Sequence, residues 1–315
     1  MSLRKVPSLN LNDYLSKDSA VRKKFVADLY SSFKEYGFVV LNNHTVPKEL
    51  MAKAYVLQQQ MFDLPVEEKM KYFMNNGGQR GYTPFGTERA KGEKVEDLKE
   101  FFHVGRDNQN LGLLPNQWPE GVPEFKETFL EIYSSLESAG DLLLEAFGEA
   151  IGVLPGYFKA ITKDGNSVLR LLHYPPVPEG AKPSAIRAKK HTDINLITLL
   201  VAGSTSGLQL LDKTGDWLPV DSDVNNLVVN MGDMLSRMCG GGAAGSDGVP
   251  STVHQVINPD PSKNVSRLSL PMFIHPRSEV VLSCLPQFQA TGEVLPDITA
   301  GEFLEQRLRE IGLKK

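Results

Sequence analysis

The sequence is short of cysteine and of long hydrophobic runs, and both shortages exclude classes of protein. Its two cysteines, Cys239 and Cys284, are too few for a disulfide framework and lack the spacing of a zinc site. No stretch approaches the roughly 20 apolar residues of a transmembrane helix, and residues 1–20 contain no apolar segment of signal-peptide length. We therefore expect a soluble, cytoplasmic protein whose thiols are reduced.

An excess of positive charge is also missing. The chain carries 34 Lys and Arg residues against 38 Asp and Glu residues, which gives a net charge of −4. This balance provides no electrostatic reason to expect binding to nucleic acid or to an anionic membrane. The composition is that of a globular protein, with 41% hydrophobic residues and no repeat period. The expected partner is a small molecule, and the expected assembly is a monomer or a weak homo-oligomer.

The first part of the chain, residues 1–115, alternates strand and helix patterns. The predicted elements are a strand at 6–11, a helix capped by Asp18 or Ser19 and stopped by Gly37, a strand at 38–41, a helix from Pro47 toward Phe62, and a short helical turn at 67–72. Residues 80–106 mix aromatic side chains with many charges. This segment is either a surface loop with a few core anchors or a functional loop.

The second part, residues 116–315, begins with a helix and continues as strands. Apolar residues recur every three or four positions from 123 to 151, which predicts a long amphipathic helix. Short strand patterns follow at 168–174, 196–202, 207–211, 227–230, 252–257, 268–274 and 280–282. Thr299 and Glu302 are spaced as a capping box for a closing helix. The expected fold is mainly β with flanking helices, as a sandwich or jelly roll.

A candidate metal site lies among these strands. Side chains at positions i and i+2 of a strand project to the same side, so His191 and Asp193 point together. His254, in its own strand pattern, is the candidate for a third ligand. Two imidazoles and one carboxylate leave coordination positions open, which is the arrangement of non-haem Fe(II) oxygenases. The His-x-Asp spacing alone is a weak signal.

A candidate anion clamp strengthens this interpretation. Arg267 and Ser269 share a face of the next predicted strand, inside an otherwise apolar run. A guanidinium and a hydroxyl together suit a carboxylate. A buried arginine is costly without an anionic partner, so the pattern predicts a bound carboxylate.

The order of these motifs resembles the isopenicillin N synthase-like family of 2-oxoglutarate- and Fe(II)-dependent oxygenases. The resemblance rests on the following motifs, in chain order: EYGFVVLNNHTVP, FDLPVEEKMKY, RGYTPFGTE, DLKEFFHVG, HYPP, HTD, GLQLL, MGDMLSR, STVH and RLS. It covers nearly the whole chain. It implies an amino-terminal α/β region at 1–115 and a double-stranded β-helix dioxygenase domain at 116–315, together expected to form one compact unit.

The resemblance also implies roles for particular residues. His191, Asp193 and His254 would bind Fe(II), and Arg267, Ser269 and Tyr174 would hold the far carboxylate of 2-oxoglutarate. Dioxygen would then oxidise an unidentified small molecule by hydroxylation, desaturation or ring closure, with release of succinate and CO2. Residues 80–106 would lie over the iron and shape the substrate pocket. Because strand residues alternate, Tyr174 would face inward and His173 outward.

Two features depart from the family pattern. Leu172 stands where many members have an Asn that helps to hold the near carboxylate of the co-substrate. Residues 239–248 form a Gly-rich stretch in place of a short link, which predicts a mobile loop, either inert or controlling access to the site.

Three other functions remain open from the sequence. The chain could be an Fe(II) oxidase of the same fold that uses no 2-oxoglutarate, and its arginine would then bind a substrate carboxylate. It could be a sensor that binds iron and 2-oxoglutarate without turnover. A hydrolytic zinc site on the same ligands is the least favoured alternative, because it leaves Arg267 and Ser269 without a role.

Overall fold

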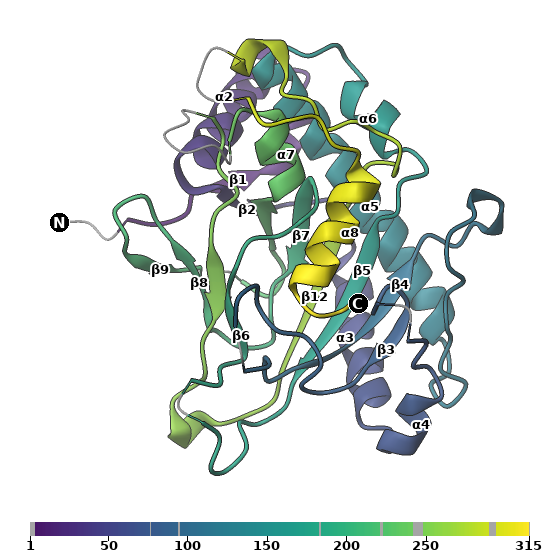
Figure 1. The fold of residues 1–315 in the computed structure, drawn as a ribbon. Coiled ribbons are helices and arrows are strands. Elements are labelled where there is room, and N and C mark those ends of the chain that lie inside the picture. Colours follow the sequence, from purple (N-terminus) through teal and green to yellow (C-terminus); the bar gives the residue numbers. More distant parts are fainter. Residues whose placement is uncertain are drawn as a thin grey trace.

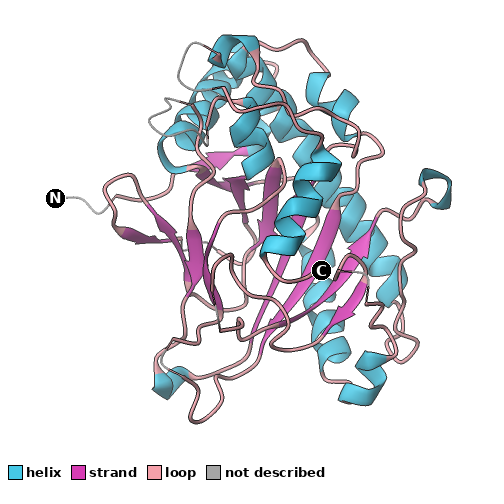
Figure 2. Cartoon of the chain, in the orientation of Figure 1, coloured by secondary structure: helices cyan, strands magenta, loops and turns pink. Residues whose placement is uncertain are grey.

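The computed structural model describes residues 4–75, 77–93, 95–182, 184–220, 223–241, 248–289 and 294–314. Two β-sheets face each other, and helices cover the outer face of the larger sheet (Figures 1 and 2). Most of the Gly-rich stretch predicted to be mobile, residues 242–247, lies outside the described residues. Among the residues described, no helix combines the length and apolarity that crossing a bilayer requires.

The strands are β1 (Ser8–Asn10), β2 (Phe38–Asn42), β3 (Gly81–Thr83), β4 (Glu100–Gly105), β5 (Val168–Tyr174), β6 (Ala188–His191), β7 (Ile197–Val201), β8 (Leu208–Leu211), β9 (Trp217–Pro219), β10 (Leu227–Met231), β11 (His254–Val256) and β12 (Arg267–Ile274). The α-helices are α1 (Leu11–Tyr14), α2 (Ser19–Tyr36), α3 (Lys48–Phe62), α4 (Val66–Met70), α5 (Phe125–Ile151), α6 (Tyr157–Thr162), α7 (Asp233–Met238) and α8 (Ala300–Glu310). Short 3-10 helices lie at Gln109–Leu111, Pro261–Lys263 and Pro286–Phe288.

The larger sheet has the strand order β1-β2-β10-β7-β12-β5-β4-β3, and the smaller sheet has the order β6-β11-β8-β9. β2 pairs with β10 and β4 pairs with β5, so the amino-terminal strands extend the sheet that the later strands begin. The expected class, mainly β with flanking helices around a jelly-roll core, is confirmed. The division of the chain at residues 115 and 116 stays a prediction.

The strands of the larger sheet separate two environments by strict alternation. Along β5, Leu169 and Leu171 pack into the core beneath the helices, whereas Arg170, Leu172 and Tyr174 line a cavity between the sheets. β12 behaves in the same way: Leu268, Leu270, Met272 and Ile274 enter the core, and Arg267, Ser269, Pro271 and Phe273 line the cavity. Period-two alternation therefore gives each strand one structural face and one face toward the cavity.

The helices follow the expected signals. The Asp18 carboxylate caps α2 by accepting a hydrogen bond from the backbone N–H of Ala20 at 2.8 Å, and Gly37, with φ of 65°, ends the helix. In α5, a Cβ at Gly140 would lie 3.1 Å from Ile274 of β12. This close approach explains how α5 packs along the outer face of the sheet, as the sequence predicts (Figure 1).

The prediction of a strand at 280–282 is wrong. This segment makes one isolated bridge, from Val281 to Thr299, and its backbone otherwise follows a turn closed by a hydrogen bond from Val280 N–H to the Arg277 carbonyl at 3.1 Å. Strand-favouring residues without a neighbouring strand do not form a ladder. Conversely, residues 80–106 contain β3 and β4, whose polar residues Glu100 and His103 conceal the strand pattern in the sequence.

Replacing Thr299 by alanine should destabilise the protein by about 1 kcal/mol. The Thr299 hydroxyl accepts from the backbone N–H of Glu302 at 3.2 Å, and the Glu302 carboxylate accepts from the backbone N–H of Thr299 at 3.1 Å. The predicted capping box is thus present, and its loss leaves helix donors unsatisfied. Chemical denaturation measures the change, with Thr299→Ser as a control that keeps the cap. Equal stability of both variants would contradict this role.

Candidate metal centre and active site

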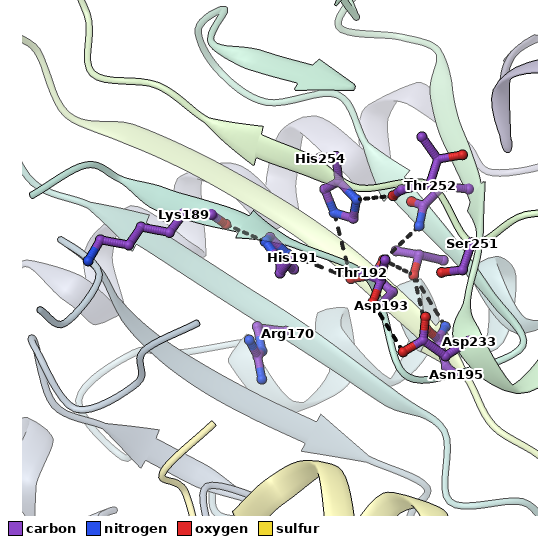
Figure 3. Close-up of polar contacts among 12 residues, drawn as sticks. Arg170, Lys189, His191, Thr192, Asp193, Asn195, Asp233, Ser251, Thr252 and His254 are labelled. Atoms are coloured by element: carbon purple, nitrogen blue, oxygen red, sulfur yellow. Dashed lines mark hydrogen bonds and ion pairs between the residues drawn. The ribbon is translucent and has the colours of Figure 1, made fainter. Parts of the chain in front are cut away.

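Three side chains, two from paired antiparallel strands and one from the loop after the first of them, converge at one end of the cavity. β6 ends at His191, β11 begins at His254, and these two residues are paired in the register of the smaller sheet. Asp193 lies in the loop after β6, so its position comes from that loop and not from strand alternation as the sequence suggested. Its Oδ1 atom is 3.8 Å from His191 Nε2 and 3.7 Å from His254 Nε2 (Figure 3).

Backbone carbonyls fix both imidazole rings. His191 Nδ1 lies 2.6 Å from the carbonyl oxygen of Lys189, and His254 Nδ1 lies 3.1 Å from that of Thr252. Because a carbonyl only accepts, each Nδ1 carries the proton, and each Nε2 presents a lone pair toward the space shared with Asp193. The rings are therefore oriented as metal ligands.

The Asp193 carboxylate is held with one oxygen free. Its Oδ2 atom accepts hydrogen bonds from the Thr198 hydroxyl at 2.5 Å and from the Asn230 side-chain amide at 2.8 Å. Oδ1, which faces the histidines, is left to act as a ligand. Sequence reasoning missed both donors, although a single Asn in the apolar strand LVVNM is a detectable signal.

Burial, with a smaller contribution from His254, lowers the pKa of His191 to about 4. Burial would raise the pKa of the Asp193 carboxyl, but the two imidazoles and the two hydrogen bonds lower it below its usual value. A neutral imidazole and an ionised carboxylate are the protonation states that a metal ion requires of its ligands. The ligand atoms of all three residues lie within 4.8 Å of one another. The geometry and protonation of the site thus fit a divalent metal.

The loop that carries Asp193 is fastened to two helices. At the start of α7, the backbone N–H of Asp233 donates to the carbonyl of Asp193 at 2.7 Å, and the Asp233 carboxylate accepts from the Thr192 hydroxyl at 3.1 Å. Arg307 of α8 donates to the same carboxylate at 2.6 Å. Helix α8 is therefore connected directly to the loop that carries Asp193. Leu304 and Leu308 of this helix and Ile311, just after its end, line the cavity.

Asn230→Ala should weaken Fe(II) binding about 10- to 100-fold, the usual effect of removing a group that orients a metal ligand. The substitution leaves Asp193 able to rotate, because only Thr198 would still hold Oδ2. Equilibrium dialysis against Fe(II) measures the change. Asn225→Ala is a matched control, since the Asn225 side chain bonds to Asp223 in the turn before β10 and has no contact with the ligands. Unchanged iron affinity in Asn230→Ala would exclude the orienting role.

The cavity has a volume of about 470 Å³, within the usual range of small-molecule sites. Arg267, Ser269 and Tyr174 all line it, and Arg267 and Tyr174 are directly opposite each other in the β12–β5 ladder. The Arg267 guanidinium carbon lies 5.3 Å from the centre of the Tyr174 ring. The three residues expected to hold a carboxylate thus occupy one wall.

Arg267 is 2% exposed and incompletely partnered. Its Nε donates to the carbonyl of Thr205 at 3.1 Å, and its buried Nη1 makes no hydrogen bond to any described residue. No described carboxylate lies within ion-pair distance of it. An unpaired guanidinium in an enclosed wall fits a carboxylate ligand, since burying it without an anion is costly.

Three of the four remaining histidines lie on or next to strands of the larger sheet, and they differ in the face that they occupy. His173 is buried on the outer face of β5, where its Nδ1 lies 2.7 Å from Glu100 and its ring stacks on Phe62. His275 lines the cavity, and burial lowers its pKa to about 4. His103 also lines the cavity, within the 80–106 segment. Leu172, at the position of the family Asn, is a cavity residue as well.

Two family models match the sequence. Residues 6–121 match the model described as non-haem dioxygenase in morphine synthesis N-terminal, and residues 165–276 match the model of the 2OG-Fe(II) oxygenase superfamily. Among curated proteins, the 2-oxoglutarate-Fe(II) type oxidoreductase hxnY of Emericella nidulans is 32% identical over 302 residues, covering 91% of this chain and 84% of that protein.

Solved structures similar to this chain include proteins of the same kind. A 2OG-Fe(II) oxygenase family protein from Caulobacter crescentus is 39% identical, with a TM-score of 0.84 and coverage of 96% of this chain and 98% of that one. A full-length Neurospora crassa protein in complex with alpha-KG and thymine is 26% identical, with a TM-score of 0.86 and 96% coverage of both chains. The chain belongs to the 2OG-Fe(II) oxygenase superfamily. It is an oxidoreductase that uses Fe(II), 2-oxoglutarate and dioxygen to oxidise a small molecule.

Proposed function

We propose that His191, Asp193 and His254 bind the Fe(II) of this oxygenase. The observation that carries the proposal is the convergence of two Nε2 atoms and one carboxylate oxygen, each fixed from behind by a hydrogen bond. We propose further that Arg267, Ser269 and Tyr174 bind the far carboxylate of 2-oxoglutarate. The unpartnered Nη1 of Arg267 in the same cavity supports this assignment.

The residues of the chain position the reactants. When bound, iron supplies the redox chemistry that couples dioxygen to the oxidation of 2-oxoglutarate, with succinate and CO2 as products. The Nδ1–H groups of His191 and His254 keep their rings oriented, and Thr198 and Asn230 keep one oxygen of Asp193 available. Arg267 neutralises and orients the co-substrate. Apolar side chains of the cavity, such as Leu172 and Phe273, exclude water around it.

Succinate formation tests the proposal. Purified protein is incubated with Fe(II), dioxygen and 2-oxoglutarate, and each component is omitted in turn. We expect succinate only when all three are present. Substrate turnover without 2-oxoglutarate would instead identify an Fe(II) oxidase. Binding of iron and 2-oxoglutarate without succinate would identify a sensor, and turnover without dioxygen would identify a hydrolase.

The cellular location, the assembly and the size of the substrate are also part of the proposal. We propose that the protein works in the cytoplasm as a monomer or weak homo-oligomer; its two cysteines are free and buried, as a reducing compartment favours. For the substrate, the thymine in the Neurospora crassa complex supports a molecule of similar size. Gel filtration and fractionation test the assembly and the location.

A further inference from the structure

A cluster of charged and polar residues, all buried except the partly buried Arg170, lines the cavity beside the proposed iron and 2-oxoglutarate sites. Its members are Glu88, Asp97, Lys99, His103 and Arg170. Lys99 Nζ lies 2.7 Å from the Glu88 carboxylate and 2.9 Å from that of Asp97, and Arg170 Nη1 lies 3.1 Å from Glu88. Figure 3 shows Arg170 apart from the His–Asp–His group, with no interaction joining them. None of these residues has a role in the chemistry described above.

The hydrogen bonds of Arg170 leave one donor group for a ligand. Arg170 Nε donates to His103 Nε2 at 2.6 Å, so that nitrogen carries no proton. His103 Nδ1 consequently carries the proton and donates it to the Gly78 carbonyl. With Nε bound to His103 and Nη1 bound to Glu88, the guanidinium cannot rotate. Its Nη2 makes no hydrogen bond or ion pair within the described ranges, and Arg170 borders the cavity.

The charges of the cluster already balance. Lys99 and Arg170 carry two positive charges, Glu88 and Asp97 carry two negative charges, and His103 is neutral because burial holds its pKa well below the ordinary value. Burial would raise the pKa of Glu88, but Arg170 and Lys99 outweigh it and lower that pKa, which keeps the carboxylate ionised. A carboxylate bound at Arg170 would therefore give this cluster a net negative charge, whereas a neutral carbonyl oxygen would only accept a hydrogen bond.

Aromatic rings beside the guanidinium indicate the shape of the ligand. The Arg170 guanidinium carbon lies 4.2 Å from the ring centre of Phe101 and 5.2 Å from that of Phe273. Phe273 lies on the adjacent strand β12 and lines the cavity too. A flat ring can pack against Phe273 while an oxygen on its edge reaches Nη2, since aromatic faces and fixed guanidinium edges both favour planar partners.

We propose that Arg170 and Phe273 form the substrate-recognition site, and that the substrate is a neutral, planar ring compound whose carbonyl oxygen accepts a hydrogen bond from Arg170 Nη2. The proposal rests on the proposed function, because the same cavity must also hold iron and 2-oxoglutarate. It names a specificity-determining residue and a substrate class. A carboxylated ring compound is the class that it excludes.

A matched pair of probes tests the substrate class. Uracil is a neutral ring with carbonyl oxygens, and orotate is the same ring with a carboxylate. Their affinities are measured without dioxygen, on protein loaded with Fe(II) and 2-oxoglutarate. We expect uracil to bind at least ten-fold more tightly than orotate. Absence of uracil binding, or equal or tighter binding of orotate, would overturn the proposal.

Substitutions of Arg170 test its role in substrate binding. Arg170→Met should weaken uracil binding about 10- to 100-fold, the range for a hydrogen bond from a charged donor, while Glu88 stays paired with Lys99. Arg170→Lys keeps the charge and removes Nη2, so the same loss is expected even if the methionine variant folds poorly. Arg309→Met, at an exposed arginine of α8 that pairs with Glu305 outside the cavity, should leave uracil affinity unchanged.

The affinity for 2-oxoglutarate distinguishes failure of the proposed function from failure of the role proposed for Arg170. In both Arg170 variants it should stay within two-fold of the natural protein, because Arg267 and not Arg170 is assigned to the co-substrate. If the natural protein does not load with iron and 2-oxoglutarate, the proposed function fails. If it loads normally and Arg170→Lys binds uracil as well as the natural protein does, only the role of Arg170 is refuted.

Discussion

Asp193→Ala is expected to abolish succinate formation and to weaken Fe(II) binding by more than about 100-fold. Loss of a group that only hydrogen-bonds to a metal ligand already weakens metal binding about 10- to 100-fold, and loss of the ligand itself should cost more. The variant removes the one carboxylate of the proposed ligand set and leaves only the imidazoles of His191 and His254 to bind the cation. Equilibrium dialysis against Fe(II) measures the affinity, and succinate release measures the activity. The effect should be the largest of any single substitution discussed for this protein.

Two further variants make the result specific. Asp193→Asn keeps the shape of the side chain but not its charge, and should lose activity too. Asp28→Ala removes an exposed carboxylate of α2 that pairs with Lys24, and should change neither iron affinity nor turnover. If Asp193→Ala binds Fe(II) as tightly as the natural protein, the ligand assignment is wrong.

Arg267→Ala should raise the 2-oxoglutarate concentration needed for half-maximal turnover by roughly 30-fold or more, which corresponds to at least about 2 kcal/mol for a charge left unpaired. The guanidinium is buried, and its Nη1 has no partner among the described side chains and carbonyls. Steady-state kinetics at varied 2-oxoglutarate measures the change. The iron affinity should stay the same, because Arg267 is not among the proposed iron ligands.

A co-substrate analogue tests the proposed contact between Arg267 and the far carboxylate of 2-oxoglutarate. 2-Oxobutyrate has the reactive 2-oxo acid group but no far carboxylate. The natural protein should strongly prefer 2-oxoglutarate, whereas Arg267→Ala should lose most of that preference. Arg277→Ala, at an exposed arginine paired with Glu279, serves as the surface control. A preference that survives in Arg267→Ala would mean that another group binds the far carboxylate.

Signals that act locally or through strand alternation were readable from the sequence. The caps at Asp18 and Thr299 depend on adjacent residues, and both are present. The shared face of Arg267 and Ser269 follows from period two along β12, and both residues line the cavity. The convergence of His254 with His191 needed more than local pattern, since the β6–β11 pairing joins distant segments; the resemblance to a family supplied it.

Other parts depended on tertiary contacts that no local pattern encodes. Asn230 and Thr198 act on Asp193 only because β10 and β7 pass behind the ligand loop. The clustering of Glu88 with Arg170 needs a loop of the amino-terminal region to fold over β5. Arg170 did have a signal: it interrupts the apolar run VLRLLHY just as Arg267 interrupts its own strand, and the same reasoning applies to both.

The two faces of β5 have a consequence for how such enzymes diversify. Leu169, Leu171 and His173 hold the strand to the helical side, whereas Arg170, Leu172 and Tyr174 line the cavity. Selection for a new substrate can therefore replace Arg170 or Leu172 without disturbing the residues that maintain the fold. Related enzymes can therefore keep the same fold while their substrate specificity changes, because the residues responsible for each occupy alternate positions of one strand.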